Sequence, residues 1–192
     1  MYAPRSYLIV CILLSGMMLG TAPGPSAAQF TFTRVAATGD PAPDRPGASF
    51  GLFNGLALGN EGTLALVGET AFNHGGVWVT RPEGLRELTK SSFNEMIFVR
   101  DDGKPVRANA AEIVLYDGTT PVTIAGIELP APGLPGTTFR QLLEVTFNPN
   151  GNLLFGARTN PPSSGVEGLW AYRGGSVELI AYSGQAAPVW LC

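Results

Sequence analysis

The chain has 192 residues, which is room for one domain of ordinary size or for a few small repeats. Hydrophobic residues make up 45% of it and charged residues 14%, so it holds enough apolar material to exclude wholesale disorder. A formal net charge of −3 supplies no basic field for nucleic acid, and the 25 Gly and 16 Pro residues indicate many turns between short strands.

Residues 1–28 predict a secretory signal peptide. Arg5 supplies a positive charge, residues 7–19 (YLIVCILLSGMML) form an uncharged apolar run, and the small residues at 26–28 predict cleavage before Gln29. The run is shorter than the roughly 20 residues that a membrane helix needs, so we expect no stable membrane span. An uncleaved N-terminal anchor remains the alternative. We expect a secreted or cell-surface protein.

Cysteine usage offers no internal disulfide after this cleavage. Cys11 lies inside the apolar run and is removed with it, which leaves Cys192, the last residue. Val10 stands where lipid attachment to Cys11 would need a small residue, which argues against a lipoprotein. Because Cys192 could pair only between chains, the mature fold must be stabilised by its hydrophobic core.

A tandem repeat organises the mature chain, residues 29–192. Residues 42–70 align with residues 131–159 without a gap. The matched pairs include Pro43 with Pro132, Pro46 with Pro135, Gly47 with Gly136, Phe50 with Phe139, and Gly62 with Gly151. After a short insertion, Gly76-Val77-Trp78 matches Gly168-Leu169-Trp170. Turn and core positions that recur in one order indicate repeated structural units.

Degenerate copies extend this array. Residues 91–98 resemble the second part of the unit and residues 114–125 the third, without the proline-rich opening, while residues 180–188 resemble residues 35–43. The expected units are therefore residues 33–90, 91–125 and 126–181, with a stub at 182–192. Closed propellers use four to eight blades, so we expect a piece of a longer array. A short protein with a terminal cap, or a homo-oligomer that completes the ring, is the alternative.

Each unit is predicted to consist of β-strands. Short apolar runs at residues 50–53, 64–67 and 76–79 are bounded by turn residues. Left-handed turn positions are expected at Asn60-Glu61-Gly62, Asn150-Gly151, Asp117-Gly118 and Gly174-Gly175. Three or four strands in about 45 residues is the size of a propeller blade, so we predict an all-β fold of propeller-like repeats, with a β-solenoid as the alternative. The predicted core residues are Phe50, Leu64, Leu66, Trp78, Phe98, Phe139, Leu153, Phe155 and Trp170.

A family resemblance follows from these motifs. Residues 148–155 (NPNGNLLF) resemble the signature of bacterial extracellular proteins with a tandem N-x-x-G-x-x-A-F repeat, and residues 39–43 (GDPAP) resemble the turn that precedes it there. The likeness spans residues 35–188 and implies a secreted or surface-displayed, propeller-like repeat of undefined role. The departures are Gly59 and Leu66 in the first copy, and Ser91 and Asn94 at the Asn and Gly positions of the middle copy.

The sequence contains no catalytic, cofactor-binding or metal-binding constellation. His74 is the sole histidine and is predicted to lie in a solvated loop. With one His and one mature Cys, zinc sites and a Cys–His nucleophile lack partners, and no Ser lies in a G-x-S-x-G elbow. We assign no site residue and no cofactor.

Carboxylates are the remaining candidates, because paired acids can hydrolyse glycosides. The set is Asp40, Asp44, Glu61, Glu69, Asp101, Asp102 and Glu144. Most of them adjoin Gly or Pro, which favours turn roles, and Asp101-Asp102-Gly103 is interpreted as a turn rather than a calcium loop. The aromatic residues Trp78, Trp170 and Tyr172 could stack on sugars, but the recurring Trp predicts core packing.

We therefore expect a secreted, non-enzymatic scaffold or binding module whose partner is an extracellular protein or a glycan. The alternative is a carbohydrate-binding or glycoside-hydrolysing module.

Overall fold

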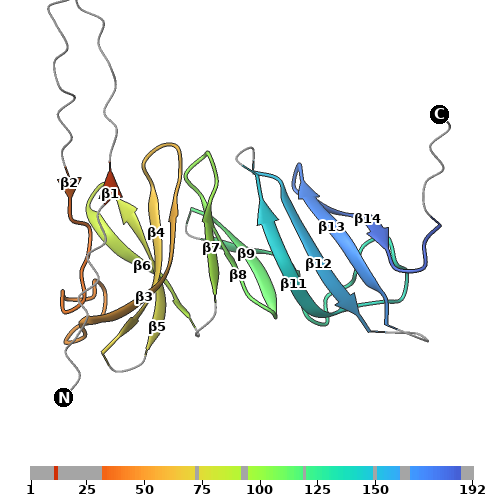
Figure 1. Ribbon diagram of the computed structural model, residues 1–192, viewed down its shortest axis with the longest axis horizontal. Coiled ribbons are helices and arrows are strands. Elements are labelled where there is room, and N and C mark those ends of the chain that lie inside the picture. Colours follow the sequence, from red (N-terminus) through yellow and green to blue (C-terminus); the bar gives the residue numbers. More distant parts are fainter. Residues whose placement is uncertain are drawn as a thin grey trace, which may run out of the picture.

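A computed structural model of the chain describes residues 11–12, 32–71, 74–91, 95–118, 120–148, 151–160 and 165–186. Within these residues every regular element is a β-strand, which confirms the all-β prediction (Figure 1). The same part of the chain holds no helix long and apolar enough to cross a membrane. Of the predicted signal peptide only Cys11 and Ile12 are described, and Cys192 lies outside the described residues.

The strands form three antiparallel sheets of four strands each, in which neighbours in sequence are neighbours in the sheet. The first sheet consists of β3 (Phe50–Leu58), β4 (Leu64–Thr70), β5 (Gly75–Arg81) and β6 (Gly84–Ser91). The second consists of β7 (Met96–Val99), β8 (Pro105–Ala108), β9 (Glu112–Asp117) and β10 (Thr120–Gly126). The third consists of β11 (Phe139–Phe147), β12 (Leu153–Thr159), β13 (Glu167–Arg173) and β14 (Ser176–Tyr182). A separate antiparallel pair joins β1 (Cys11–Ile12) to β2 (Phe32–Thr33).

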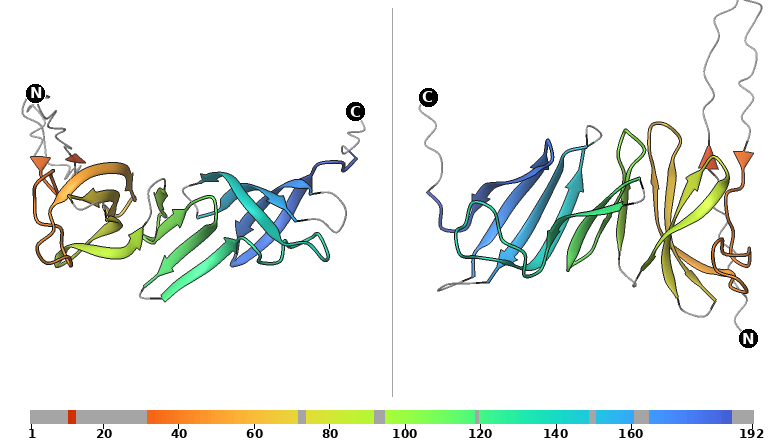
Figure 2. Two further views of the ribbon diagram at one scale, coloured as in Figure 1. Left: turned by 90° about the horizontal axis from the view of Figure 1, so that it is seen from below. Right: turned by 180° about the vertical axis from the view of Figure 1, so that it is seen from behind.

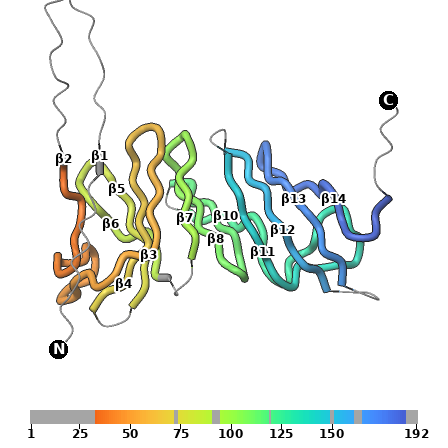
Figure 3. Tube along the Cα trace, viewed as in Figure 1, coloured from red at the N-terminus to blue at the C-terminus, as the bar shows by residue number. Residues whose placement is uncertain are grey.

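The three sheets stand in a row in chain order (Figures 1 and 2). The first strand of the second sheet, β7, lies against β3 and β4 of the first sheet. Figure 3 traces the same order along the chain, from the first sheet at one end to the third at the other. Each sheet falls within one expected repeat unit to within a residue.

One hairpin turn recurs between the first and second strands of all three sheets. The N–H groups of Gly59, Arg100 and Asn148 donate to the carbonyls of Thr63, Lys104 and Asn152, respectively. The last turn residue is left-handed each time, with φ of 79° at Gly62, 73° at Gly103 and 83° at Gly151. A type I turn followed by such a residue is a common hairpin connection, and glycine adopts it without strain.

This turn corrects the register that we expected for the middle unit. Arg100 and Gly103 occupy the Asn and Gly positions of the repeat signature, and not Ser91 and Asn94. The sequence alignment was wrong because the middle unit retains only the glycine of the signature. That glycine is the residue whose backbone conformation the turn requires.

The proline-rich openings of the first and third units have the same backbone hydrogen bonds. Ala42 N–H donates to Ala48 C=O, as Ala131 N–H does to Thr137 C=O, and isolated bridges pair Pro41 with Ser49 and Pro130 with Thr138. The indole Nε1 of Trp78 donates to Pro43 O at 3.2 Å, and that of Trp170 donates to Pro132 O at 2.9 Å. Each proline-rich opening therefore covers the Trp of its own sheet. We call these two segments, residues 41–49 and 130–138, the plugs.

The hydrophobic core consists of layers between these plugs and sheets. Trp78 and Trp170 are fully buried and meet Phe50 and Phe139 edge-on, at centroid distances of 4.9 and 5.0 Å. All the predicted core residues are buried except Phe98, which is partly buried and stacks on Phe147 at 5.8 Å. The core interpretation of the recurring Trp is thus confirmed. The largest cluster joins the second sheet to the third.

The turn near the start of the first and third units also recurs at the stub. The N–H groups of Asp40, Leu129 and Gln185 donate to the carbonyls of Ala37, Gly126 and Tyr182, respectively. The third residue of each turn is left-handed, with φ of 90° at Gly39, 67° at Glu128 and 89° at Gly184. The side chains of Asp40 and Gln185 also accept from the first N–H of their turns. The stub therefore has the local geometry with which the first and third units begin.

Candidate binding cleft

The middle sheet departs from its neighbours at the positions that form their cores. Arg107 pairs with Val114 in the register where Leu66 pairs with Trp78 and Phe155 pairs with Trp170. This unit also lacks the proline-rich plug. Because neither an indole nor a plug fills the space in front of this face, a cleft of about 480 Å³ lies between the first and second sheets.

Hydrogen-bonding side chains from both sheets line this cleft, together with the apolar surfaces of Leu88, Val114 and Pro121. The polar residues of the lining are Arg81, Glu87 and Thr89 from the first sheet, and Arg107, Glu112, Tyr116 and Thr123 from the second. The cleft therefore offers donors and acceptors on opposite walls, with short apolar stretches between them.

Arg107 is the fixed centre of the second-sheet wall. Its Nε donates to the Tyr116 hydroxyl at 3.1 Å, its Nη1 donates to Glu95 at 2.8 Å, and its Nη2 donates to Glu112. The side chains of Arg107 and Glu95 are 11% and 1% exposed. Burial lowers the pKa of Arg107, but the hydrogen bonds to Glu112 and Glu95 outweigh it and raise the pKa overall. Arg107 is thus permanently charged, and it orients Glu112 and Tyr116.

Arg81, at the end of β5, differs from Arg107 in its exposure. It lies on the cleft rim, and no described acidic side chain forms an ion pair with it. Arg173 occupies the corresponding end of β13 and pairs with Glu178 at 3.2 Å. The guanidinium of Arg81 is therefore available to a ligand in a way that the guanidinium of Arg173 is not.

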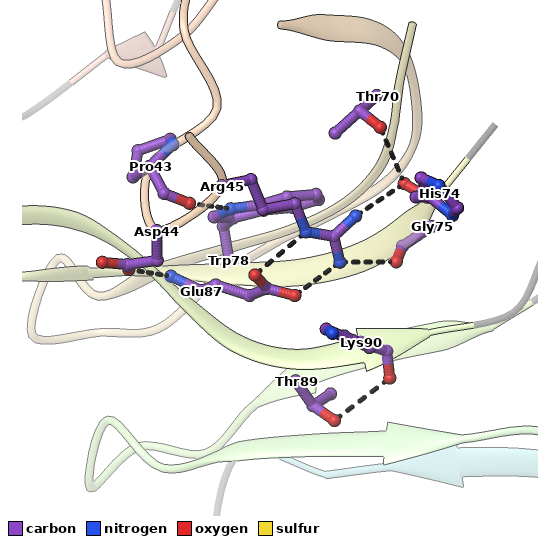
Figure 4. A network of polar contacts seen from close by, with 10 residues as sticks. All are labelled: Pro43, Asp44, Arg45, Thr70, His74, Gly75, Trp78, Glu87, Thr89 and Lys90. Carbon is purple, nitrogen blue, oxygen red and sulfur yellow. Dashed lines mark hydrogen bonds and ion pairs between the residues drawn. The ribbon is translucent and has the colours of Figure 1, made fainter. Parts of the chain in front are cut away.

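A second polar network lies on the other face of the first sheet (Figure 4). Arg45 lies over the Trp78 ring at 5.0 Å, donates from Nε to Glu87 at 2.9 Å, and donates from Nη1 and Nη2 to the carbonyls of His74 and Gly75. A pocket of about 420 Å³ borders it, with Lys90 on its wall. Because these interactions all tie the plug to β5 and β6, we interpret this network as structural.

Five of the seven acids considered as catalytic candidates interact with nearby polar groups. Asp44 accepts from the Glu87 N–H at 2.9 Å, a hydrogen bond that lowers the pKa of Asp44, and it also pairs with Arg86. The other contacts are Asp40 with Arg34, Glu69 with Asn54, Asp101 with Asn60, and Asp102 with Arg100 and Lys104. Glu61 and Glu144 are exposed, and so is His74, which immediately precedes β5. Asp101-Asp102-Gly103 forms a hairpin turn, as predicted.

The structure does not gather these acids into one site, although the turns that carry Glu61 and Asp101 lie side by side. Among the described residues, no group of three or more His, Cys, Asp or Glu side chains could hold a metal ion. Sequence reasoning missed Arg107, Glu95, Glu112 and Tyr116. The available signal was a charged residue inside a short apolar strand, but the misplaced register of the middle unit concealed that Arg107 stands at a core position.

Comparisons with known proteins add little. No protein-family model matches the chain, and neither does any curated protein sequence. Among solved structures, the crystal structure of Saccharomyces cerevisiae Sqt1 is similar over 67% of this chain and 34% of its own, with 10% identity and a TM-score of 0.38. The matched part thus spans about a third of that structure.

Proposed function

We propose that this protein is an extracellular, non-enzymatic β-repeat module that binds a glycan in the cleft between its first two sheets. The observation that carries this proposal is the loss, in the middle unit alone, of the plug and the Trp that fill the corresponding space in the other units. A mostly buried, permanently charged Arg107 stands there instead, with hydroxyl and carboxylate groups arranged around it. Polyhydroxylated ligands match such a set of planar donors and acceptors.

Three observations support a propeller-like array as the scaffold. The repeated element is a four-stranded antiparallel meander, successive sheets pack face to face, and the first strands of adjacent sheets are in contact. Export is supported by the signal-like residues 1–28 and by the resemblance of residues 148–155 to an extracellular repeat family.

Binding without hydrolysis is favoured by the state of the acids at the cleft. Glycosidases place two carboxyl groups on opposite sides of the scissile bond, roughly 5 to 9.5 Å apart. Glu112 is bound to Arg107, and the carboxylate of Glu87 is held by Arg45 on the opposite face of the first sheet. The cleft therefore lacks the opposed pair among its described residues.

A glycan array followed by calorimetry on the strongest hit tests this function. Arg81→Ala should weaken binding by about tenfold, because it removes an interaction to the ligand worth roughly 1.4 kcal/mol. Arg173→Ala is the matched control and should leave the affinity unchanged, because Arg173 lies on the third sheet. Failure of the wild type to bind any glycan, or equal losses in both variants, would contradict the proposal. Release of reducing sugar would favour the hydrolase alternative.

A further inference from the structure

The two terminal sheets each expose a face whose counterpart is buried elsewhere in the chain. In the first sheet, Ala65, Val67, Val77 and Val79 are at most 2% exposed because β7 covers them with Ile97 and Val99. The same positions in the third sheet are Leu154, Gly156, Leu169 and Ala171, as the strand registers show. Leu154, Gly156 and Leu169 border a largely apolar groove of about 750 Å³. Ala171, which is 8% exposed, borders the neighbouring pocket together with Ile180.

Ile180 extends this open face onto β14. It is 43% exposed, whereas Leu88, at the corresponding position of β6, is partly buried and packs against the cluster that β7 covers. The third sheet thus has the receiving surface of the first sheet, and no strand within the described residues is seated on it, although Met96 of β7 contributes to the lining of the groove.

The opposite end of the molecule carries the complementary surface. Leu56 and Leu58 of β3 are 48% and 56% exposed. Their counterparts in the third sheet are Val145, which is 9% exposed, and Phe147, which stacks on Phe98 of the second sheet. The second sheet therefore covers this face of the third sheet, whereas the same face of the first sheet is exposed.

The contact between the first and second sheets shows how these two surfaces could fit together. Both β3 and β7 lead into the same hairpin turn, so Leu56 and Leu58 occupy the positions of Ile97 and Val99. Since Ile97 and Val99 seat on the buried face of the first sheet, Leu56 and Leu58 have the right positions and chemistry to seat on the third. In the third unit, the plug and the second sheet pack in the same cluster with Trp170, so the plug does not prevent a sheet from packing there. The matching plug of the first unit therefore leaves room for a sheet to pack against Leu56 and Leu58.

We propose that a second copy of this chain docks its first sheet on the third sheet of the first copy, and receives the first copy's first sheet in return. Two identical head-to-tail interfaces then close a ring of six four-stranded sheets, within the range of four to eight blades that propellers use. The occupant is a second copy because the chain itself carries both halves of the interface.

Sedimentation equilibrium on the exported protein tests the ring. The wild type should be a dimer at micromolar concentration. Leu58→Glu and Ile180→Glu each place a charge on one half of the interface, and each should weaken self-association by at least tenfold. Leu52→Glu is the matched control, because Leu52 is 57% exposed on β3 while its counterpart Gln141 is already polar and exposed, and this variant should remain dimeric. Near-ultraviolet circular dichroism should be unchanged in all three.

Mixing the two interface variants gives the sharpest outcome. Each variant retains one intact half, so Leu58→Glu and Ile180→Glu together should form a heterodimer through a single undamaged interface. A monomeric wild type overturns the proposal. A dimeric wild type whose two interface variants do not form a heterodimer when mixed also overturns it. If the protein forms an open-ended polymer, the ring does not close. If the protein is a monomer because further repeat sheets of a longer chain cover the two faces, the occupant is not a second copy.

Discussion

The first and third sheets share a backbone plan but stabilise their Trp residues differently. Arg45 and Glu87 form an ion pair beside Trp78, with both side chains 11% exposed. The corresponding positions in the third unit are Leu134 and Leu179, which pack against the cluster that contains Trp170. One chain thus contains both solutions to one packing problem. Replacing a buried ion pair by apolar residues of similar volume is often neutral or stabilising, whereas breaking the pair is costly.

The largest loss of stability should come from removing the indole of Trp170, which lies in the larger of the two Trp-containing clusters. Trp170→Ala deletes a fully buried side chain that contacts Phe139 and Phe155, and it should lower the free energy of unfolding by about 3–5 kcal/mol. Trp78→Ala should cost less, because the cluster around Trp78 is smaller. Urea unfolding measures both, and equal losses would indicate that the two cores are energetically alike.

The ion pair itself is open to a double-mutant cycle. Glu87→Leu alone leaves the Arg45 guanidinium without its carboxylate partner and should cost about 3 kcal/mol. The double variant Arg45→Leu/Glu87→Leu copies the third sheet and should return to within about 1 kcal/mol of the wild type. Losses that simply add in the double variant would show that the two solutions are not interchangeable.

The plugs differ at one backbone position that allows a smaller test. Gly133 has φ of 83°, and a Cβ placed there would lie 2.7 Å from the Cβ of Leu179. Gly133→Ala should therefore destabilise the protein by roughly 1–3 kcal/mol. Asp44 holds the corresponding position at φ of 64° and accepts the Glu87 N–H with its side chain. A thermal melt of Gly133→Ala that matches the wild type would show that the third plug can shift at no cost.

The smallest effect concerns the pH dependence of the first plug. The Glu87 N–H lowers the pKa of Asp44, so this carboxylate contributes stability that is present above its ordinary pKa and is lost as the pH falls through its lower folded value. Asp44→Asn, which tolerates a positive φ, should have a lower Tm than the wild type at pH 7, and the gap should close below about pH 4. A gap that is constant between pH 7 and pH 3 would exclude this role of the carboxylate.

Much of the scaffold could be predicted from local signals. The turn glycines Gly62, Gly118 and Gly151 adopt the predicted positive φ, because the backbone conformation at each position is a property of that residue and its neighbours. The matched Trp residues are buried as expected, since a large apolar side chain that recurs at one position of a repeat has a recurring place in the core. Segments with a full repeat motif were therefore placed correctly.

The candidate cleft and the open faces depended on tertiary structure. The place of Arg107 in the cleft depends on its hydrogen bonds to Glu95, Glu112 and Tyr116, and on the lack of a plug in the middle unit. Leu56 and Val145 are both apolar residues on a first strand, yet one is exposed and the other buried, because only one has a preceding sheet against it. The sequence by itself determined turns, strands and the repeat, since these follow from local conformation and apolar alternation. Only the tertiary structure decided which faces are covered, because burial depends on which sheet packs next.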